Sequence, residues 1–272
     1  MSSEATRRTL EHAVPEWHEL PVFLGDFTTD ECAQLLAAPS PTVLLPIGST
    51  EPHGPHLPLA TDALLATEHA RRSVLALRRL GVAAVAAPAI AYGVTNYAAG
   101  FAGVVTISPN VLEALVRETC TSFRAGGFAL VCVLNHHLEP AHVDTITRAV
   151  ESIAQSPADV VFANQLRPAW GRTLSAEFKR GNCHAGSYET SLVLAAHPTA
   201  VREPIRRGLP AIDASLSDAI RAGKKTFREI GLERAYTGAP ADATRAEGDD
   251  QYQQLVSMVV SEVSTALERL SG

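Results

Sequence analysis

Short apolar runs alternate with longer amphipathic segments along most of the chain. Four of the runs have the length of strands and carry few polar residues, and they cover 42–48, 82–88, 128–135 and 159–164. Apolar residues at helical spacing predict helices over 63–80, 109–125, 140–154, 188–196 and 249–270. Gly81 follows the first of these helices and Pro109 opens the second, as is usual at helix ends.

This order of elements predicts the fold class. Nearly continuous apolar strands separated by helices are typical of an α/β fold, in which a mostly parallel sheet is covered by helices on both faces. No shift in composition marks a boundary, so we expect a single domain over 1–272 with its core at about 42–200. The stretch 222–250 is rich in Gly, Pro and charged residues and predicts a long surface excursion before the C-terminal helix.

Composition narrows the classes of function. Hydrophobic residues make up 46% of the chain, which is enough for a sizeable core, and the net charge of −6 gives none of the basic surplus of a nucleic-acid binder. No run of 18 apolar residues predicts a membrane span, and the first 17 residues hold no signal-peptide core. The four cysteines are far apart and form no C-x-x-C pair, so we expect free thiols and a cytoplasmic protein.

The first chemically informative segment follows the first predicted strand. It is a proline-rich loop that carries Glu51, His53 and Asp62 and leads into a helix. Ligands of open α/β sheets bind beyond the carboxyl ends of strands, and residues two apart in an extended segment share one side. Glu51 and His53 could therefore both reach a metal cluster. Asp62 could instead cap the helix, and a lone histidine could be an ordinary hydrogen-bonded loop residue.

The second segment follows the third predicted strand and holds His136, His137, Glu139 and His142. Such groups are unfavourable to desolvate unless they are paired or bound to metal. Imidazole and carboxylate ligands without cysteine suit zinc or manganese, with iron as a further option. Two pairs, Glu51 with His53 and His137 with Glu139, plus one bridging carboxylate suit two ions that activate a shared water. The alternative is a surface histidine cluster without metal.

The third segment contains His184 and Glu189, five residues apart in a loop that enters a helix. A histidine beside a metal-bound hydroxide can carry a proton to a leaving nitrogen. Glu189 could ligate metal or orient that histidine. A plain alternative for Glu189 is an acidic residue in the first turn of a helix.

The three segments together resemble the creatininase family. The family pattern P-x-G-S-x-E-x-H-G-P-H-L-P-x-x-T-D is matched by 46–62, and H-A-G-x-x-E-T-S is matched by 184–191. The pattern N-G-H-x-E-N is matched in part by 135–140. The resemblance extends over about 42–196.

The resemblance implies a three-layer α/β/α domain and two divalent ions per subunit. One ion would be held by Glu51, Asp62 and His137, and the other by His53, Asp62 and Glu139, with Asp62 bridging. His184 takes the place of the family's catalytic histidine. The resemblance also implies a homo-oligomer, with a hexamer favoured.

The departures from the family pattern concern the substrate. His136 replaces a glycine and Pro140 an asparagine, and Thr95–Ala98 lacks a charged pair that the family carries. The chain has only two tryptophans, Trp17 and Trp170, whereas creatininase surrounds its flat substrate with them. These differences argue against creatinine as the substrate.

The leading hypothesis is a metal-dependent hydrolase that cleaves a C–N bond in a small cyclic amide or formamide through a metal-bridging hydroxide. Its partner would be a small-molecule substrate, with no nucleic acid and no membrane. One alternative keeps the metals but changes the bond, to ring opening of a carbocyclic ketone or cleavage of a peptide precursor. A third hypothesis is a metal-binding scaffold without catalytic activity.

Overall fold

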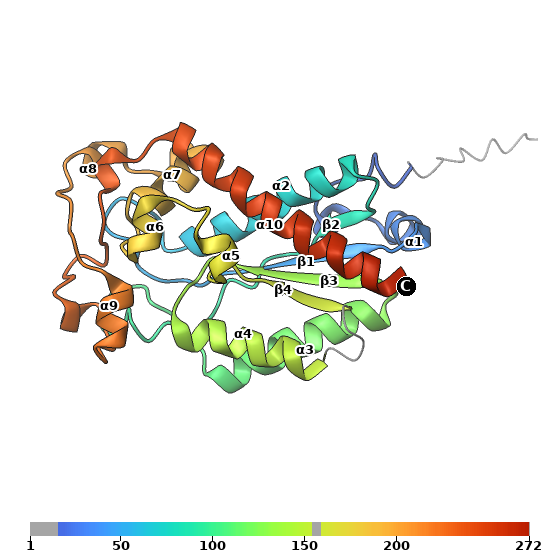
Figure 1. The fold of residues 1–272 in the computed structure, drawn as a ribbon, viewed down its shortest axis with the longest axis horizontal. Coiled ribbons are helices and arrows are strands. Elements are labelled where there is room, and N and C mark those ends of the chain that lie inside the picture. Colours follow the sequence, from blue (N-terminus) through green and yellow to red (C-terminus); the bar gives the residue numbers. More distant parts are fainter. Residues whose placement is uncertain (1–15, 154–158, 272) are drawn as a thin grey trace, which may run out of the picture.

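The computed structural model describes residues 16–153 and 159–271. Four strands form one sheet in the order β2-β1-β3-β4, and every pair is parallel (Figure 1). The strands are Thr42–Ile47 (β1), Ala84–Ala86 (β2), Leu130–Asn135 (β3) and Val160–Ala163 (β4). Each lies inside a predicted strand range, and the mostly parallel sheet is confirmed.

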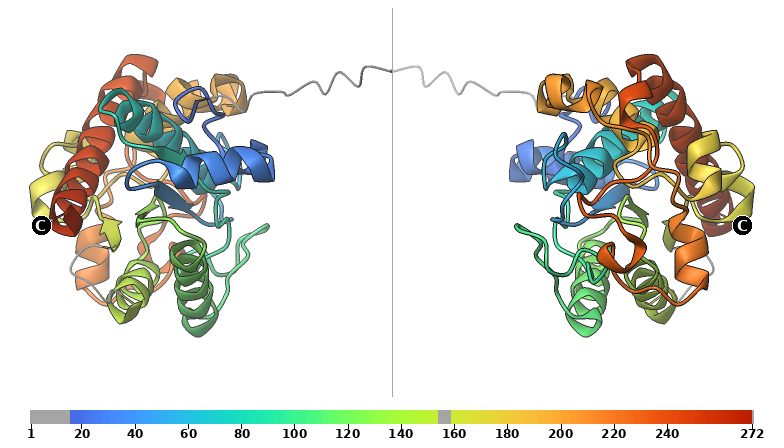
Figure 2. Two further views of the ribbon diagram at one scale, coloured as in Figure 1. Left: turned by 90° about the vertical axis from the view of Figure 1, so that its right-hand side faces the viewer. Right: turned by 90° about the vertical axis from the view of Figure 1, so that its left-hand side faces the viewer.

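Helices cover both faces of this sheet, as Figure 2 shows end-on. The covering helices are α1 (Thr29–Ala37), α2 (Thr61–Arg79), α3 (Pro109–Ala125), α4 (Pro140–Ile153), α7 (Ser187–Ala196) and α10 (Arg245–Ser271). Leu44 of β1 packs in an apolar cluster with α2, α7 and α10, whereas its neighbours Val43 and Leu45 pack with α1, α3 and α4. The alternation of side chains along a strand thus produces the α/β/α sandwich.

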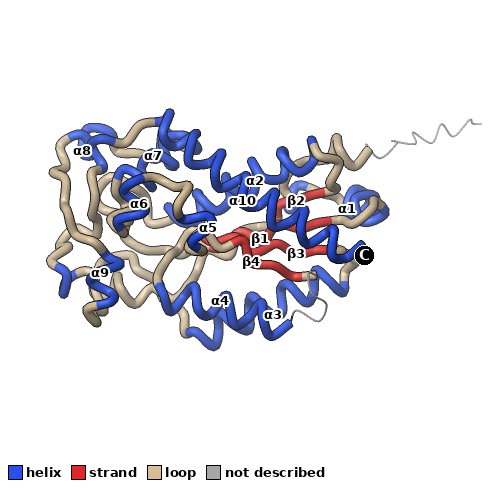
Figure 3. The backbone as a smooth tube through the Cα atoms, in the orientation of Figure 1, coloured by secondary structure: helices blue, strands red, loops and turns tan. Residues whose placement is uncertain are grey.

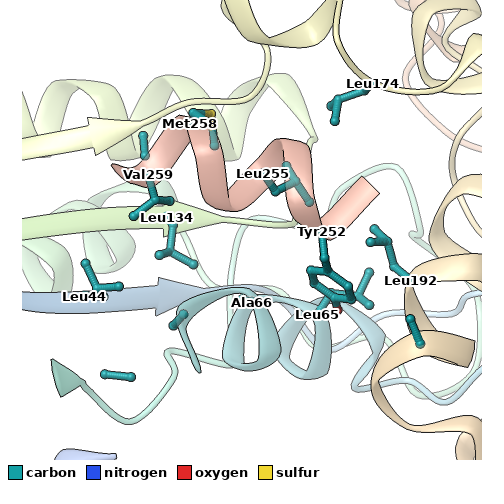
Figure 4. Packing of buried hydrophobic residues seen from close by; sticks show 14 of the residues in the cluster. Leu44, Leu65, Ala66, Leu134, Leu174, Leu192, Tyr252, Leu255, Met258 and Val259 are labelled. Atoms are coloured by element: carbon teal, nitrogen blue, oxygen red, sulfur yellow. The ribbon is translucent and has the colours of Figure 1, made fainter. Parts of the chain in front are cut away.

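The packing on one face of the sheet is dense. Figure 4 shows Leu44 and Leu134 of the sheet between Val259 of α10 and Ala66 of α2, and each of these side chains is essentially buried. Burial of apolar side chains of this size contributes roughly 1.5–3 kcal/mol each before opposing entropy. The cluster therefore fixes α2 and α10 on the sheet.

Local signals account for several helix ends. Ser108 accepts a hydrogen bond from the backbone N–H of Val111 and caps α3, whose bounds agree with the prediction. The end of α4 was predicted at residue 154, which lies outside the described residues. The C-terminal helix begins at Arg245, four residues before its predicted start.

In the described ranges, no helix has the length and apolarity needed to cross a membrane.

Loops and short helices gather beyond the carboxyl ends of the strands (Figure 3). The short helices are α5 (Pro168–Gly171), α6 (Ala176–Arg180), α8 (Glu203–Arg207) and α9 (Leu216–Arg221). The stretch 222–250 was predicted to be a surface excursion; α10 begins within it at Arg245, and the part before α10 has both exposed and buried residues. Phe227 and Leu232 are buried there in a small cluster with Ala98, and Tyr236 is buried in the larger core cluster.

The crossing of α7 and α10 depends on a glycine. A Cβ atom added at Gly248 would lie 1.9 Å from the backbone oxygen of Ser191. The close approach matters for the site described below, because α7 carries Glu189 in its first turn.

We predict that Gly248→Ala destabilises the protein by about 1–3 kcal/mol through overpacking. Alanine would otherwise stabilise a helix interior by roughly 1 kcal/mol, so the sign of the change reports the clash. Urea unfolding measures the effect. Gly208→Ala is the matched control, since its nearest contact would be 3.6 Å away, and we expect a change within about 0.5 kcal/mol. An unchanged or raised stability of Gly248→Ala would contradict the prediction.

Candidate metal centre

The register of the central strands brings the first two motifs together. Ile47 at the end of β1 pairs with Asn135 at the end of β3. The loop with Glu51 and His53 therefore leaves the sheet beside the segment with His137. Gly48 allows α2 to start against the end of β1, because a Cβ there would lie 2.5 Å from the backbone nitrogen of Ala63.

Four of the predicted metal residues meet in a buried cluster. His137 Nδ1 lies 3.0 Å from Glu51 Oε1 and 3.2 Å from Asp62 Oδ2. His53 Nε2 lies 3.0 Å from Asp62 Oδ1. Glu189 joins this cluster from α7, with its Oε2 atom 3.6 Å from His53 Nε2. Segments far apart in the sequence thus form one site.

Asp62 is central to the cluster and does not cap a helix. The residue before α2 is Ala60, and Asp62 is the second residue of the helix. Its carboxylate accepts a hydrogen bond from Ser49 Oγ at 2.7 Å and offers one oxygen to each histidine. The helix-cap alternative for Asp62 is therefore wrong.

Both histidines direct one ring nitrogen to a backbone carbonyl and the other toward the carboxylates. His53 Nδ1 donates to the backbone oxygen of Glu51 at 3.1 Å, and His137 Nε2 donates to that of Val94 at 2.8 Å. In the neutral form that ligates metal, each ring then faces the carboxylates with a lone pair. His53 Nε2 and Glu51 Oε2 are buried without a hydrogen-bond partner. Nitrogen and carboxylate lone pairs that converge on one place hold a cation once the ring protons are displaced, so the residues fit divalent metal ions.

The electrostatics agree with this geometry. Burial alone lowers the pKa of His53, but the carboxylates of Asp62, Glu189 and Glu51 outweigh burial and raise this pKa to about 10. Burial raises the pKa of Glu189 to about 8 despite the neighbouring His53. A site that attracts a proton this strongly through clustered carboxylates also attracts metal cations.

Two groups of potential ligands share one residue. Glu51, Asp62 and His137 form the first group, and His53, Asp62 and Glu189 form the second. A further group in the described part of the chain combines Glu51 and His53 with His184. The shared carboxylate of Asp62 is what two adjacent ions need for a bridge.

Glu139 lies beside these groups and in none of them. Its carboxylate accepts hydrogen bonds from the backbone N–H groups of Asn96 and Tyr97, each at 3.1 Å. Its Oε2 atom is 3.9 Å from His137 Nε2, which is the nitrogen bonded to Val94. Glu189, rather than Glu139, is the carboxylate that lies beside His53 and Asp62 in the structure.

His184 faces the cluster from the opposite side. Its Nε2 atom donates to the backbone oxygen of Pro52 at 3.0 Å, and its Nδ1 atom is 3.9 Å from Glu51 Oε1. Burial and the nearby His53 lower the pKa of His184 to about 4. A neutral His184 with a free Nδ1 can accept a proton at the centre.

Two features near His184 were missed by sequence reasoning. Phe227 stacks on its ring, with centroids 4.5 Å apart and planes at 29°. Ala185 adopts a left-handed φ of 52°, and its backbone N–H donates to Glu189 Oε2 at 2.7 Å. Such a conformation is uncommon in residues other than glycine and here orients a carboxylate of the site. Neither contact has a signal at the level of spacing or composition.

The cluster forms the floor of a cavity of about 320 Å³. Its walls are mainly apolar and come from Leu138, Pro140, Leu166, Phe178, Leu216, Ile220 and Phe227. Arg221 is the one lysine or arginine among the described residues that line it. The cavity has room for a group larger than a single small ring.

Comparisons with known proteins agree with the motifs. The family model described as creatininase, creatinine amidohydrolase, matches residues 25–263. The mycofactocin precursor peptide peptidase of Mycobacterium tuberculosis is 32% identical over 94% of this chain and 97% of its own length. The creatinine amidohydrolase of Pseudomonas putida is 25% identical over 66% of this chain and 74% of its own length.

Solved structures share the fold. A mutant creatininase aligns with a TM-score of 0.72 at 21% identity, covering 91% of this chain and 99% of that one. A manganese form of creatininase aligns with a TM-score of 0.65 at 21% identity, covering 90% and 98%. A mutant of Zn–Zn type aligns similarly, with a TM-score of 0.67 at 20% identity over 90% and 98%.

The raised pKa of His53 leads to a pH prediction for metal binding. At pH 7 the metal-free imidazole carries a proton, because its pKa is about 10. Zinc must displace this proton, so we expect proton release on binding and an apparent affinity that rises by about tenfold per pH unit for each proton displaced. Titration calorimetry in buffers of different ionisation enthalpy measures both effects. His53→Asn should release about one proton fewer, and binding without proton release in the wild type would refute the prediction.

Proposed function

This chain belongs to the creatininase family and is a metal-dependent amidohydrolase, and we propose that it hydrolyses the amide C–N bond of a peptide at a centre of two divalent ions. The observation that carries the proposal is the position of Asp62. Its two carboxylate oxygens face different histidines, and each histidine belongs to a separate group of three potential ligands.

We assign the first ion to Glu51, Asp62 and His137, and the second to His53, Asp62 and Glu189. Glu189 is preferred to Glu139 because its carboxylate is aimed at His53 by the backbone N–H of Ala185. Zinc and manganese both suit these nitrogen and oxygen donors. When bound, two such ions lower the pKa of a shared water and polarise a carbonyl group.

His184 would move the proton that amide cleavage requires. Its Nδ1 atom faces the carboxylate cluster, while the bond from Nε2 to Pro52 fixes the ring. A neutral imidazole can take a proton from the attacking water and pass it to the departing nitrogen. The stacked ring of Phe227 keeps water from the other face of His184.

Glu139 would shape the wall of the cavity. It holds the backbone of Tyr97, and the backbone oxygen of Tyr97 in turn accepts a hydrogen bond from the N–H of Phe227 at 2.9 Å. Burial raises the pKa of Glu139 above its usual range. A change in this carboxylate would act on Phe227 through the backbone of Tyr97.

A peptide is favoured over a small cyclic amide or formamide for two reasons. The apolar walls of the cavity suit side chains, which a small polar ring lacks. The relatives that match more than nine-tenths of this chain are named as peptidases, whereas the creatinine amidohydrolase matches about two thirds. Creatinine is disfavoured as a substrate, because this chain lacks the tryptophans that surround the substrate in creatininase.

The assembly and compartment are part of the same proposal. We propose a homo-oligomer, a hexamer being favoured by the family resemblance, because Leu59, Tyr92, Val105, Val111 and Leu115 are large apolar residues left exposed. We propose a cytoplasmic location because all four cysteines are free thiols. Sedimentation velocity would give the size of the assembly.

We predict that chelation of metal abolishes peptide hydrolysis and that zinc or manganese restores it. The substrates to compare are peptides with apolar side chains, lactams, formamides and cyclic diketones. His184→Ala serves as a control that keeps its metal and loses about 10²–10⁴-fold in kcat. Turnover of lactams or formamides alone would overturn the peptide assignment, and full activity of the metal-free protein would overturn the metal centre. A variant His184→Ala with unchanged activity would overturn the role of His184 as the proton carrier.

We predict different metal contents for two glutamate variants. Glu189→Gln should bind about one ion per subunit instead of two, because it removes a ligand of the second group. Glu139→Gln should keep both ions, since its contacts are backbone N–H groups. Elemental analysis after gel filtration measures both. If Glu139→Gln lost an ion and Glu189→Gln did not, the second ion would belong to Glu139.

A further inference from the structure

His142 is a buried histidine that the proposed function does not use. It lies in the first turn of α4 and is fully buried. Its ring packs edge-on against the ring of His137, with centroids 4.7 Å apart and planes at 73°. The hydrogen bonds of His142 therefore affect how the ring of His137 is held.

The hydrogen bonds of His142 form a circle that begins and ends on His137. His137 Nε2 bonds the backbone oxygen of Val94, and the backbone nitrogen of Val94 bonds His142 Nδ1 at 3.2 Å. His142 Nε2 bonds Asn135 Oδ1 at 3.1 Å. Asn135 then returns to His137, since its Oδ1 accepts from the backbone N–H at 3.1 Å and its Nδ2 donates to the backbone oxygen.

One arrangement of protons satisfies the whole circle. The backbone of His137 fixes the Asn135 amide, because an N–H must meet its oxygen and a carbonyl must meet its NH₂ group. Asn135 Oδ1 can only accept, so the proton of His142 is on Nε2. His142 Nδ1 is then bare and accepts from the N–H of Val94. The same peptide segment presents the carbonyl of Val94 to His137, so the proton of His137 is on Nε2.

The backbone leaves room for this arrangement by means of a glycine. A Cβ atom at Gly93 would lie 2.4 Å from both Nδ1 and Cε1 of His142. Only glycine lets the ring of His142 reach the peptide of Val94. The contact between His142 and the peptide of Val94 therefore depends on two positions of the chain, His142 itself and Gly93.

We propose that His142 is a positioning residue that holds the segment of Val94 and thereby orients the ring of His137, so that Nε2 bonds the carbonyl of Val94 and Nδ1 faces the metal site. The inference rests on the proposed metal centre. The carbonyl that accepts from a ligating histidine is a usual partner in metal sites, and its loss typically lowers metal affinity by about 10–100-fold. Here the carbonyl belongs to a loop, so its position depends on His142.

Substitutions at His142 separate its hydrogen bonds from its volume. His142→Asn keeps an acceptor near the position of Nδ1 for the N–H of Val94. His142→Gln keeps a donor near the position of Nε2 for Asn135 but releases Val94. We expect His142→Asn to bind zinc within about threefold of the wild type, and His142→Gln and His142→Ala to bind about 10–100-fold more weakly. Competition with a chromophoric chelator measures the affinity.

Two further variants make the test specific. Gly93→Ala keeps every hydrogen-bonding group but displaces the ring of His142, and it should lose as much affinity as His142→Gln. Thr145→Val is the matched control on α4, because it removes a buried hydrogen bond to Ala141 outside the circle. It should leave zinc affinity unchanged even if stability falls.

A spectroscopic measurement reports the proton itself. In the cobalt-loaded protein, the Nε2–H proton of His137 should give a hyperfine-shifted NMR signal that exchanges slowly with water. We expect this exchange to accelerate in His142→Gln and not in His142→Asn. Comparison of these two variants carries the test if His142→Ala fails to fold.

The outcomes are separable from those of the proposed function. Wild-type zinc affinity in His142→Gln, or equal losses in His142→Asn and His142→Gln, would overturn the positioning role, because the bond to Val94 would then not matter. A wild type that binds no metal, or a His137→Ala variant that binds normally, would overturn the metal centre instead.

Discussion

The structure depends on the burial of several carboxylates in one small volume. Glu51, Asp62 and Glu189 lie almost without exposure at the end of the sheet, and burial of ionised carboxylates is very unfavourable unless positive charge compensates it. Two divalent ions would leave one net positive charge over these three carboxylates. That balance suits an attacking water and a polarised carbonyl, whereas without metal the protonated forms of His53 and His137 supply the compensating charge.

The three histidines of the centre follow one rule. His53, His137 and His184 each direct an N–H to a backbone carbonyl and turn the other nitrogen to the cluster. The main chain therefore determines which nitrogen is free, and few side-chain torsions remain to be fixed when ions bind. Glycines at close approaches, such as Gly48, let the chain reach those positions.

The sequence predicts the layers and most of the cluster, because both depend on local patterns. Apolar runs of strand length predict a buried sheet, and polar residues just past those runs predict a site at its edge. The helix at Thr29–Ala37 escaped prediction, although Thr28 and Glu31 form a capping box that a search for this signature would have found. The site's walls could not be predicted, since Phe227 meets His184 only through the tertiary fold.

The spacing of His137 and Glu139 shows the limit of such reasoning. Two residues apart, they would share a side of an extended segment, but here the chain leaves β3 and turns into α4. Glu139 consequently reaches the backbone of Asn96 and Tyr97, while Glu189 arrives from α7. A motif fixes which residues are near a site but not which atoms point inward.

A row of contacts connects the wall of the cavity to His184, the proposed proton carrier. These contacts determine which changes in the wall could admit a different substrate. Glu139 holds Tyr97, Tyr97 holds Phe227, and Phe227 stacks on His184. None of these contacts involves Asp62 or the other groups of the cluster floor. Changes in segment 222–244, which carries Phe227, would therefore alter the shape of the cavity without contacting the cluster floor. The chain thus combines the family's metal motif with cavity walls whose described residues include Tyr97, Phe178 and Phe227 but no tryptophan.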